Sequence, residues 1–260
     1  MSPAQALRMR SILGAEKPKA APPIALGAGA TDRALGGGLA RAALHEVYAA
    51  VGDAAAATGF TAAAALRAAG AKSILWARQD FLESEAGALN PSGLAEFGLD
   101  PSRIVLVRCR DGEAVLRAGE QAARCAALGA VVIEPWGEPK LLDFTVSRRL
   151  ALAASKSGVP IFLLRIAAMP RQSAAATRWN VEALASRALD ANAPGFPAFK
   201  LSLLRLRGGV AGQMWRVEWN RDRRTFEDFA RGAAAPVSGA VVSVSADRPA
   251  EALGDIRRAG

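Results

Sequence analysis

The sequence has few of the residues that bind transition metals or form disulfides. Its 260 residues include two cysteines, Cys109 and Cys125, and one histidine, His45. Both cysteines lie in apolar segments and neither has a partner at C-x-x-C spacing, so we expect reduced, buried thiols and no metal site. No second histidine or cysteine stands near His45 in the sequence, which favours a structural role for its ring.

Long apolar runs are also missing. No uninterrupted apolar segment reaches the roughly 18 residues that a membrane-spanning helix requires. Arg8 and Arg10 stand near the N-terminus, but the apolar stretch that follows such residues in a signal peptide is not there. We therefore expect a soluble, cytoplasmic protein with no membrane partner.

What the chain does contain is a large apolar fraction and an excess of basic residues. Apolar residues make up 51% of the sequence, which is enough for a sizeable core and argues against global disorder. Lysine and arginine outnumber aspartate and glutamate by 33 to 24, for a net charge of +9. This excess suits a polyanionic partner such as nucleic acid, or simply the surface of an arginine-rich protein, and charge alone does not decide between the two.

The segments predict three regions. Residues 1–24 resemble an arm, with a short amphipathic stretch and then a Lys/Pro-rich piece that cannot continue a helix. Residues 25–231 form the predicted core domain. Residues 232–260 are rich in alanine, proline and serine, and are predicted to be a flexible tail.

Short apolar segments alternate with helical patterns through the first two thirds of the core. This alternation predicts an α/β fold, with a largely parallel central sheet covered by helices on both faces. Residues 170–197 are predicted to be a long irregular connection. An antiparallel hairpin at one edge is expected from residues 199–206 and 213–219. The predicted strands are 43–50, 73–77, 104–109, 130–133 and 159–166, and the main predicted helices are 59–71, 112–128 and 144–157.

A degenerate phosphate-binding loop is predicted after the first strand. Such a loop has the pattern G-x-x-x-x-G-K-[ST], in which backbone amides and the lysine bind phosphates. Residues 54–61 read AAAATGFT, so Gly59 and Thr61 match, while Ala54 replaces the first glycine and Phe60 replaces the lysine. Residues 52–58 are expected to form the loop itself. An ordinary strand–turn–helix is the alternative.

Several segments resemble RecA. They are residues 26–48, 74–78, 98–107 and 131–134, and the last of these places Glu134 at the acidic position of the Walker B strand. The resemblance spans residues 25–225 and fails where ATP chemistry lies. Arg78 stands at the position of the catalytic glutamate, and a sensor glutamine is replaced at or near Arg165. Two roles stay open for these arginines, namely binding an anion or pairing with Glu134.

Within RecA-like proteins the chain is most similar to the ImuA family. The similar segments are residues 75–77, 142–150, 173–179, 203–209 and 215–219. The resemblance implies a RecA-like three-layer sandwich of the P-loop type. It also implies a non-catalytic accessory protein of the SOS response, without a cofactor, acting in mutagenesis and translesion synthesis with ImuB and an error-prone DnaE-type polymerase, and modulating RecA. The alternatives are a DNA-dependent RecA-like ATPase and a SulA-type cell-division inhibitor.

The resemblance gives two sets of candidate site residues. Gly59, Phe60, Thr61 and Glu134 would form a degenerate, inactive nucleotide site. A second set of basic and aromatic residues would bind DNA or a protein partner, because arginine and tryptophan are common in both kinds of interface. These residues are Arg148, Arg149, Arg171, Arg178, Trp179, Arg205, Arg207 and Trp215.

Overall fold

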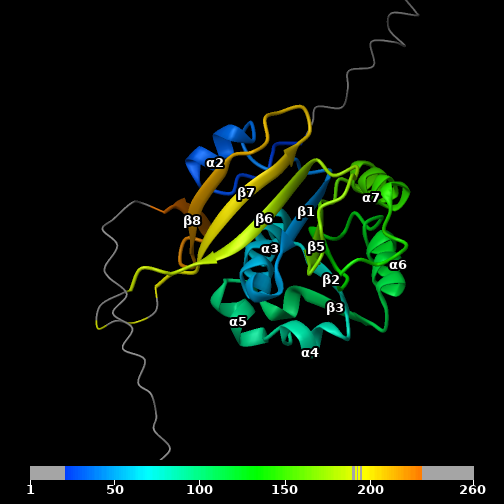
Figure 1. The fold of residues 1–260 in the computed structure, drawn as a ribbon, viewed down its shortest axis with the longest axis horizontal. Coiled ribbons are helices and arrows are strands. Elements are labelled where there is room, and N and C mark those ends of the chain that lie inside the picture. The colour runs from blue at the N-terminus through cyan, green and yellow to red at the C-terminus, as the bar shows by residue number, and fades with distance from the viewer. Residues whose placement is uncertain (1–20, 189–190, 192, 194, 230–260) are drawn as a thin grey trace, which may run out of the picture. The chain divides into compact units, whose positions relative to one another are not determined.

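A single nine-stranded sheet organises the protein, which we describe from a computed structural model of residues 21–188, 191, 193 and 195–229 (Figure 1). The sheet begins with six parallel strands, in the order β3 (Ile104–Cys109), β2 (Ile74–Gln79), β4 (Ala130–Glu134), β5 (Ile161–Ile166), β1 (Leu44–Ala49) and β6 (Thr177–Leu184). Three antiparallel strands complete it, namely β7 (Ala198–Leu206), β8 (Met214–Asn220) and β9 (Thr225–Asp228).

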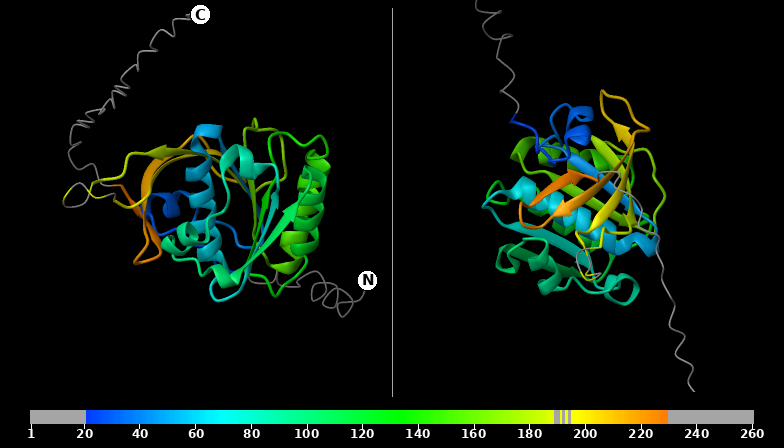
Figure 2. Two further views of the ribbon diagram at one scale, coloured as in Figure 1. Left: turned by 90° about the horizontal axis from the view of Figure 1, so that it is seen from below. Right: turned by 90° about the vertical axis from the view of Figure 1, so that its left-hand side faces the viewer.

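Helices cover both faces of the parallel half. α3 (Ala54–Ala69) packs on one face, and α6 (Gly112–Ala122) and α7 (Phe144–Ser157) lie on the other (Figure 2). The strands are apolar on both faces, as buried parallel strands must be. In β4, for example, Val132 belongs to the core under α3, whereas Val131 and Ile133 belong to the core under α6 and α7. The predicted three-layer sandwich with a largely parallel sheet is confirmed.

The remaining helical elements are short. α2 (Gly29–Ala34) precedes β1, and the 3₁₀ turn η1 (Val51–Asp53) follows it. Between β2 and β3 the chain forms α4 (Leu82–Ala86), α5 (Pro91–Glu96) and the 3₁₀ turn η2 (Pro101–Arg103).

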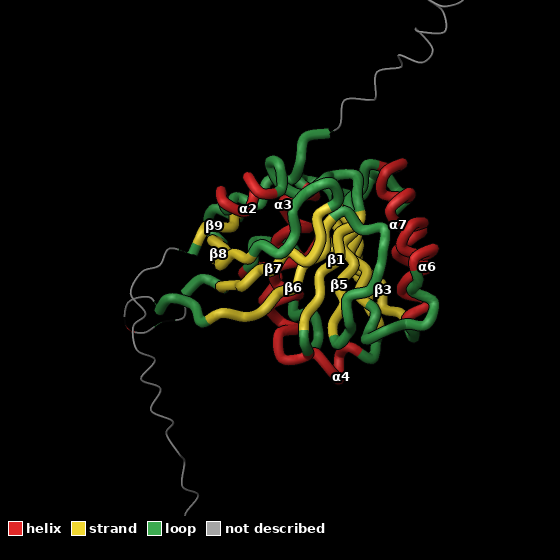
Figure 3. Tube along the Cα trace, turned by 45° about the horizontal axis from the view of Figure 1, so that its top comes forward, coloured by secondary structure: helices red, strands yellow, loops and turns green. Residues whose placement is uncertain are grey.

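The prediction of an irregular connection over residues 170–197 is wrong for residues 177–184, which form β6. Its residues alternate between buried and partly exposed from Thr177 to Glu182, as expected for a strand. β6 pairs in parallel with β1 and antiparallel with β7, so it joins the two halves of the sheet. The predicted hairpin of β7 and β8 is confirmed, but β9 was not predicted and forms the outer edge beyond it (Figure 3).

The folded core begins earlier than residue 25. Ile24, assigned to the predicted arm, is buried and forms a β-bridge with Leu39. Gly38 has φ +133°, and a Cβ added there would lie 2.2 Å from the Ile24 carbonyl oxygen, so this close approach requires glycine. The rest of the arm and the predicted tail at 232–260 lie outside the described residues.

Two further expectations concern the cysteines and the membrane. Cys109 is buried as expected, but Cys125 is exposed, because α6 ends at Ala122 rather than continuing to residue 128. Within the part of the chain that the structure describes, no helix is long and apolar enough to cross a bilayer. No group of three or more potential metal ligands occurs in that part either.

Candidate functional site

The segment predicted as a phosphate loop is helical. β1 ends at Ala49, η1 covers Val51–Asp53, and α3 begins at Ala54, so the predicted loop at residues 52–58 is wrong. Alanine has the highest helix propensity, and Ala54 stands where a loop glycine would interrupt the helix. The helix therefore extends back almost to the strand. The connection that remains, residues 50–53, is too short to wrap around a phosphate group in the manner of the eight-residue motif.

Phe60, at the position of the phosphate-loop lysine, is a core residue. Only 1% of its surface is exposed. Its ring centroid lies 5.4 Å from that of Phe226, 6.1 Å from that of Trp179 and 6.5 Å from that of Phe199. These separations are typical of packed aromatic pairs. The ring thus packs between α3 and strands β6, β7 and β9, and is not accessible to a ligand.

The neighbours of Phe60 in the motif are also part of the packing. A Cβ added at Gly59 would lie 2.8 Å from the Phe97 ring, so this glycine permits close contact between α3 and an aromatic side chain. Thr61 is fully buried, and its hydroxyl makes no hydrogen bond with the described residues. The three residues predicted to contact a nucleotide therefore lie inside the protein.

Glu134, the fourth predicted member of the nucleotide site, lies in a buried polar cluster. Arg78 in β2 stands opposite it in the register, and the Arg78 Nε lies 3.1 Å from the Glu134 Oε2. The Trp76 indole donates a 2.7 Å hydrogen bond to the same oxygen. Glu134 is fully buried, and burial raises its pKa to about 7 against the opposing effects of Arg78 and Trp76. Of the two roles left open for Arg78, the structure therefore supports the ion pair.

Arg165 has a different partner. Its guanidinium donates a 3.2 Å hydrogen bond to the Gly137 carbonyl oxygen and lies 5.5 Å from the centre of the Tyr48 ring. The Arg178 guanidinium lies 5.9 Å from the centre of the same ring. Arg165 thus supports the sheet through a cation–π contact and does not pair with Glu134.

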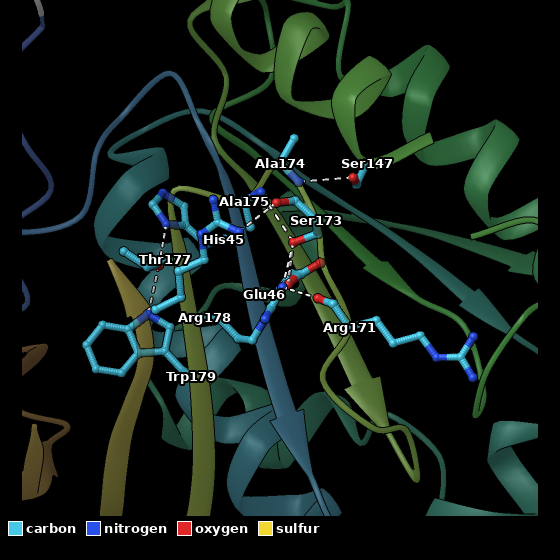
Figure 4. A network of polar contacts seen from close by, with 11 residues as sticks. His45, Glu46, Ser147, Arg171, Ser173, Ala174, Ala175, Thr177, Arg178 and Trp179 are labelled. Atoms are coloured by element: carbon cyan, nitrogen blue, oxygen red, sulfur yellow. Dashed lines mark hydrogen bonds and ion pairs between the residues drawn. The ribbon is translucent and has the colours of Figure 1, made fainter. Parts of the chain in front are cut away.

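A second site was predicted in the segment after β5, where the chain returns to begin β6. Glu46 in β1 is buried and anchors this segment (Figure 4). Its carboxylate accepts a 2.8 Å hydrogen bond from the Arg178 Nε and a 2.9 Å hydrogen bond from the Ser173 hydroxyl. The Ser147 hydroxyl of α7 accepts a 3.0 Å hydrogen bond from the Ala174 amide. These contacts fix the segment to the sheet on one side and to α7 on the other.

Two of the predicted binding arginines also hold this segment. Arg205 donates a 2.9 Å hydrogen bond to the Ser173 carbonyl oxygen, and Arg207 donates to the carbonyl oxygen of Ala174. Arg178 and these two side chains satisfy backbone and carboxylate acceptors within the protein. They are consequently less available to bind DNA phosphates than the sequence suggests.

Trp179 is buried and cannot stack on a base in this structure. None of its surface is exposed, and its indole donates a 2.9 Å hydrogen bond to the Thr177 hydroxyl. Trp215 packs against it at a centroid distance of 6.0 Å and is partly buried. The burial of Trp179 corrects the interpretation of this residue as a nucleic-acid contact. Trp179 instead packs within the protein, against Phe60 and Trp215.

His45 has the structural role that the sequence predicts. Its ring contacts the Thr177 hydroxyl and the Ala40 carbonyl oxygen, each at 2.8 Å, and stacks on Phe162. Burial lowers its pKa to about 4, so the ring is neutral at physiological pH.

The remaining predicted binding residues are exposed. Arg171 pairs with Glu138, and in Figure 4 its side chain extends away from the cluster around Glu46. Arg149 pairs with Glu120 at a groove of about 480 Å³ between α6 and α7. Arg148 is exposed on α7 and forms no ion pair with the described residues. These arginines do not converge on the predicted nucleotide site.

Comparison with known proteins establishes the fold alone. No protein-family model matches the chain, and no curated protein matches it in sequence. The crystal structure of the RadB recombinase is similar, with a TM-score of 0.55 and 17% sequence identity over 80% of this chain and 100% of that chain. The fold is therefore RecA-like.

Replacing Phe60 by alanine tests the packing of its ring. Removing a buried aromatic side chain leaves a cavity between α3 and the antiparallel strands, so we expect the free energy of unfolding to fall by about 3–5 kcal/mol. Urea denaturation measures this change. Leu152→Ala, at a residue on α7 that is 50% exposed, is the control and should cost less than about 1 kcal/mol. An equally small loss for Phe60→Ala would show that the ring is not packed.

Glu134→Gln tests the raised pKa of this buried carboxyl through the pH dependence of stability. The folded-state pKa of about 7 exceeds the ordinary value of 4.5, so the native state binds the proton more tightly than the unfolded state. The stability that this carboxyl contributes is complete below about pH 4.5 and is lost as the pH rises through about 7. The wild type should therefore lose about 1–3 kcal/mol relative to Glu134→Gln between pH 5 and pH 8. The exposed Glu113→Gln should show no such difference, and parallel pH profiles for Glu134→Gln and the wild type would contradict the assignment.

Proposed function

We propose that this protein is a non-hydrolysing RecA-like adaptor that acts in the cytoplasm in DNA-damage-induced mutagenesis. The observation that carries the proposal is the position of Phe60, buried in the core within an uninterrupted α3. A phosphate loop stabilises the transferred phosphoryl group through amides and a lysine, and the loss of one such electrostatic contact typically costs two to three orders of magnitude in rate. In this protein the first turns of α3 replace the loop amides, and the aromatic cluster around Phe60 replaces the lysine.

The acidic position of the Walker B strand supports the same conclusion. Glu134 is buried against Arg78 and Trp76, so its carboxylate already has a cation and a hydrogen-bond donor. A magnesium ion at the Glu134 carboxylate would have to enter a fully buried site and lie close to the Arg78 charge. The geometry therefore favours a structural use of these residues over metal-assisted hydrolysis.

The partners in this proposal come from the resemblance to the ImuA family. They are ImuB and an error-prone DnaE-type polymerase, with RecA as a further contact. The likeness to a recombinase supports a place in DNA repair. Several resembling segments form structurally central elements, including the start of α7, the segment that leads into β6 and the hairpin of β7 and β8. Direct DNA binding by the exposed Arg148, Arg149 and Arg171 is secondary in this proposal.

Nucleotide binding and turnover test the enzymatic half of the proposal. Purified protein titrated with a fluorescent ATP analogue and magnesium should show no saturable binding up to about 1 mM, with or without single-stranded DNA. RecA, measured in parallel, provides the positive control. ATP hydrolysis that co-purifies with the protein and decreases in the Glu134→Gln variant would contradict the proposal and favour a DNA-dependent ATPase.

Capture from DNA-damaged cells tests the adaptor half. Tagged full-length protein should retain ImuB and the DnaE-type polymerase, and the amounts should be unaffected by depletion of ATP from the lysate. The exposed-surface variant Met214→Ser provides a control for nonspecific adhesion. Retention of the cell-division GTPase in place of ImuB would instead favour a SulA-type inhibitor.

A further inference from the structure

The loops at the carboxyl ends of the parallel strands carry exposed apolar side chains. Open α/β sheets bind their ligands at this edge, usually through glycine-rich and polar loops. Here the loops after four neighbouring strands, β2, β4, β5 and β1, each present at least one large apolar residue with an exposed fraction between 47% and 71%. We call this set the edge surface, and it consists of Val51, Phe81, Leu141, Phe144 and Met169.

The loops that carry the edge surface are tied to one another. Phe81 packs edge-to-face on Trp136 at a centroid distance of 6.2 Å. The Trp136 amide donates a 3.2 Å hydrogen bond to the Gln79 side chain, and the Met169 amide donates a 3.1 Å hydrogen bond to the Glu138 carboxylate. A surface held in this way loses little conformational entropy when a partner binds. The edge surface therefore has the rigidity of a preformed docking site.

The charge at this edge is opposite to that of the chain. Although the protein has a net charge of +9, carboxylates outnumber cations in the loops after β1, β2, β4 and β5. Arg108, at the end of β3, pairs with Asp80 and Glu83, while Glu85 makes no ion pair with the residues that the structure describes. In the residues that directly follow these strands (50–53, 80–86, 135–143 and 167–176), the carboxylates are Asp53, Asp80, Glu83, Glu85, Glu138 and Asp143, and the cations are Lys140 and Arg171.

We propose that the edge surface docks a segment of a partner protein that carries apolar anchor residues flanked by lysine or arginine. This inference rests on the proposed adaptor function and assigns it a surface. Phe81 and Met169 offer apolar contact area, and Glu85 of α4, together with the excess of carboxylates in these loops, favours a basic partner by charge complementarity. Nucleic acid suits this edge poorly, because its phosphates would lie among carboxylates.

A displayed library of random 12-residue peptides tests the proposal without a known partner. Peptides selected on wild-type protein should contain an apolar residue flanked by basic residues. Their affinity should fall about tenfold or more for the double variant Phe81→Ser, Met169→Ser. The matched control is Val210→Ser, Met214→Ser, which removes comparably exposed apolar residues in the β7–β8 turn and at the start of β8, and should bind as the wild type does. The thermal unfolding midpoint should be the same for the wild type and the two double variants.

The charge is tested separately. Glu83→Lys, Glu85→Lys should weaken the selected peptides several-fold, and the same change at Glu113, which is exposed on α6, should not. Peptides that bind all variants equally, or single-stranded DNA that binds in a Phe81-dependent way, would overturn the proposal. The two proposals can fail independently, because loss of ImuB capture with intact peptide selection contradicts only the adaptor assignment, and the reverse result contradicts only the edge surface.

Discussion

The contact of Phe60 with Trp179, Phe199 and Phe226 is the interaction on which the rest of this structure depends. It joins α3, which follows the first parallel strand, to the antiparallel half of the sheet. Because the ring fills the core at this point, the position cannot hold a lysine without burying an unpaired charge, which is very costly. The residue that a nucleotide would need is thus excluded by the packing that completes the fold.

Several charged residues at predicted binding positions also make their contacts inside the protein. Arg78 pairs with Glu134 inside the sheet and Arg178 pairs with Glu46 of β1, while Arg205 and Arg207 donate to carbonyl oxygens of the segment that leads into β6. These contacts leave the net charge of +9 unchanged, but they direct the hydrogen-bond donors of these arginines inward, away from an external polyanion. The apolar, acidic edge left at the ends of the parallel strands is more suited to a protein than to a phosphate.

The sequence predicted the layered fold well and the site only in part. Parallel strands such as 104–109 at the edge and the buried 130–133 are short apolar runs bounded by turn residues, and they were located to within one residue. β6 was missed although Thr177 to Glu182 alternate between buried and partly exposed, because the proline, glycine, asparagine and arginine residues of 170–197 suggested an irregular connection. The phosphate-loop pattern outweighed the helix propensity of Ala54 to Ala57. Pairing of Arg78 with Glu134 was open in the sequence, because only the register of β2 and β4 brings the two residues together.

Amide hydrogen exchange across residues 54–60 tests the central claim most directly. If α3 begins at Ala54, the amides of residues 58–60 donate to carbonyl oxygens one turn earlier and should exchange slowly, at rates close to those of residues 61–66, and magnesium-ATP should not change them. Fast exchange that slows when the nucleotide is added would show a phosphate-binding loop in this segment and would contradict the account.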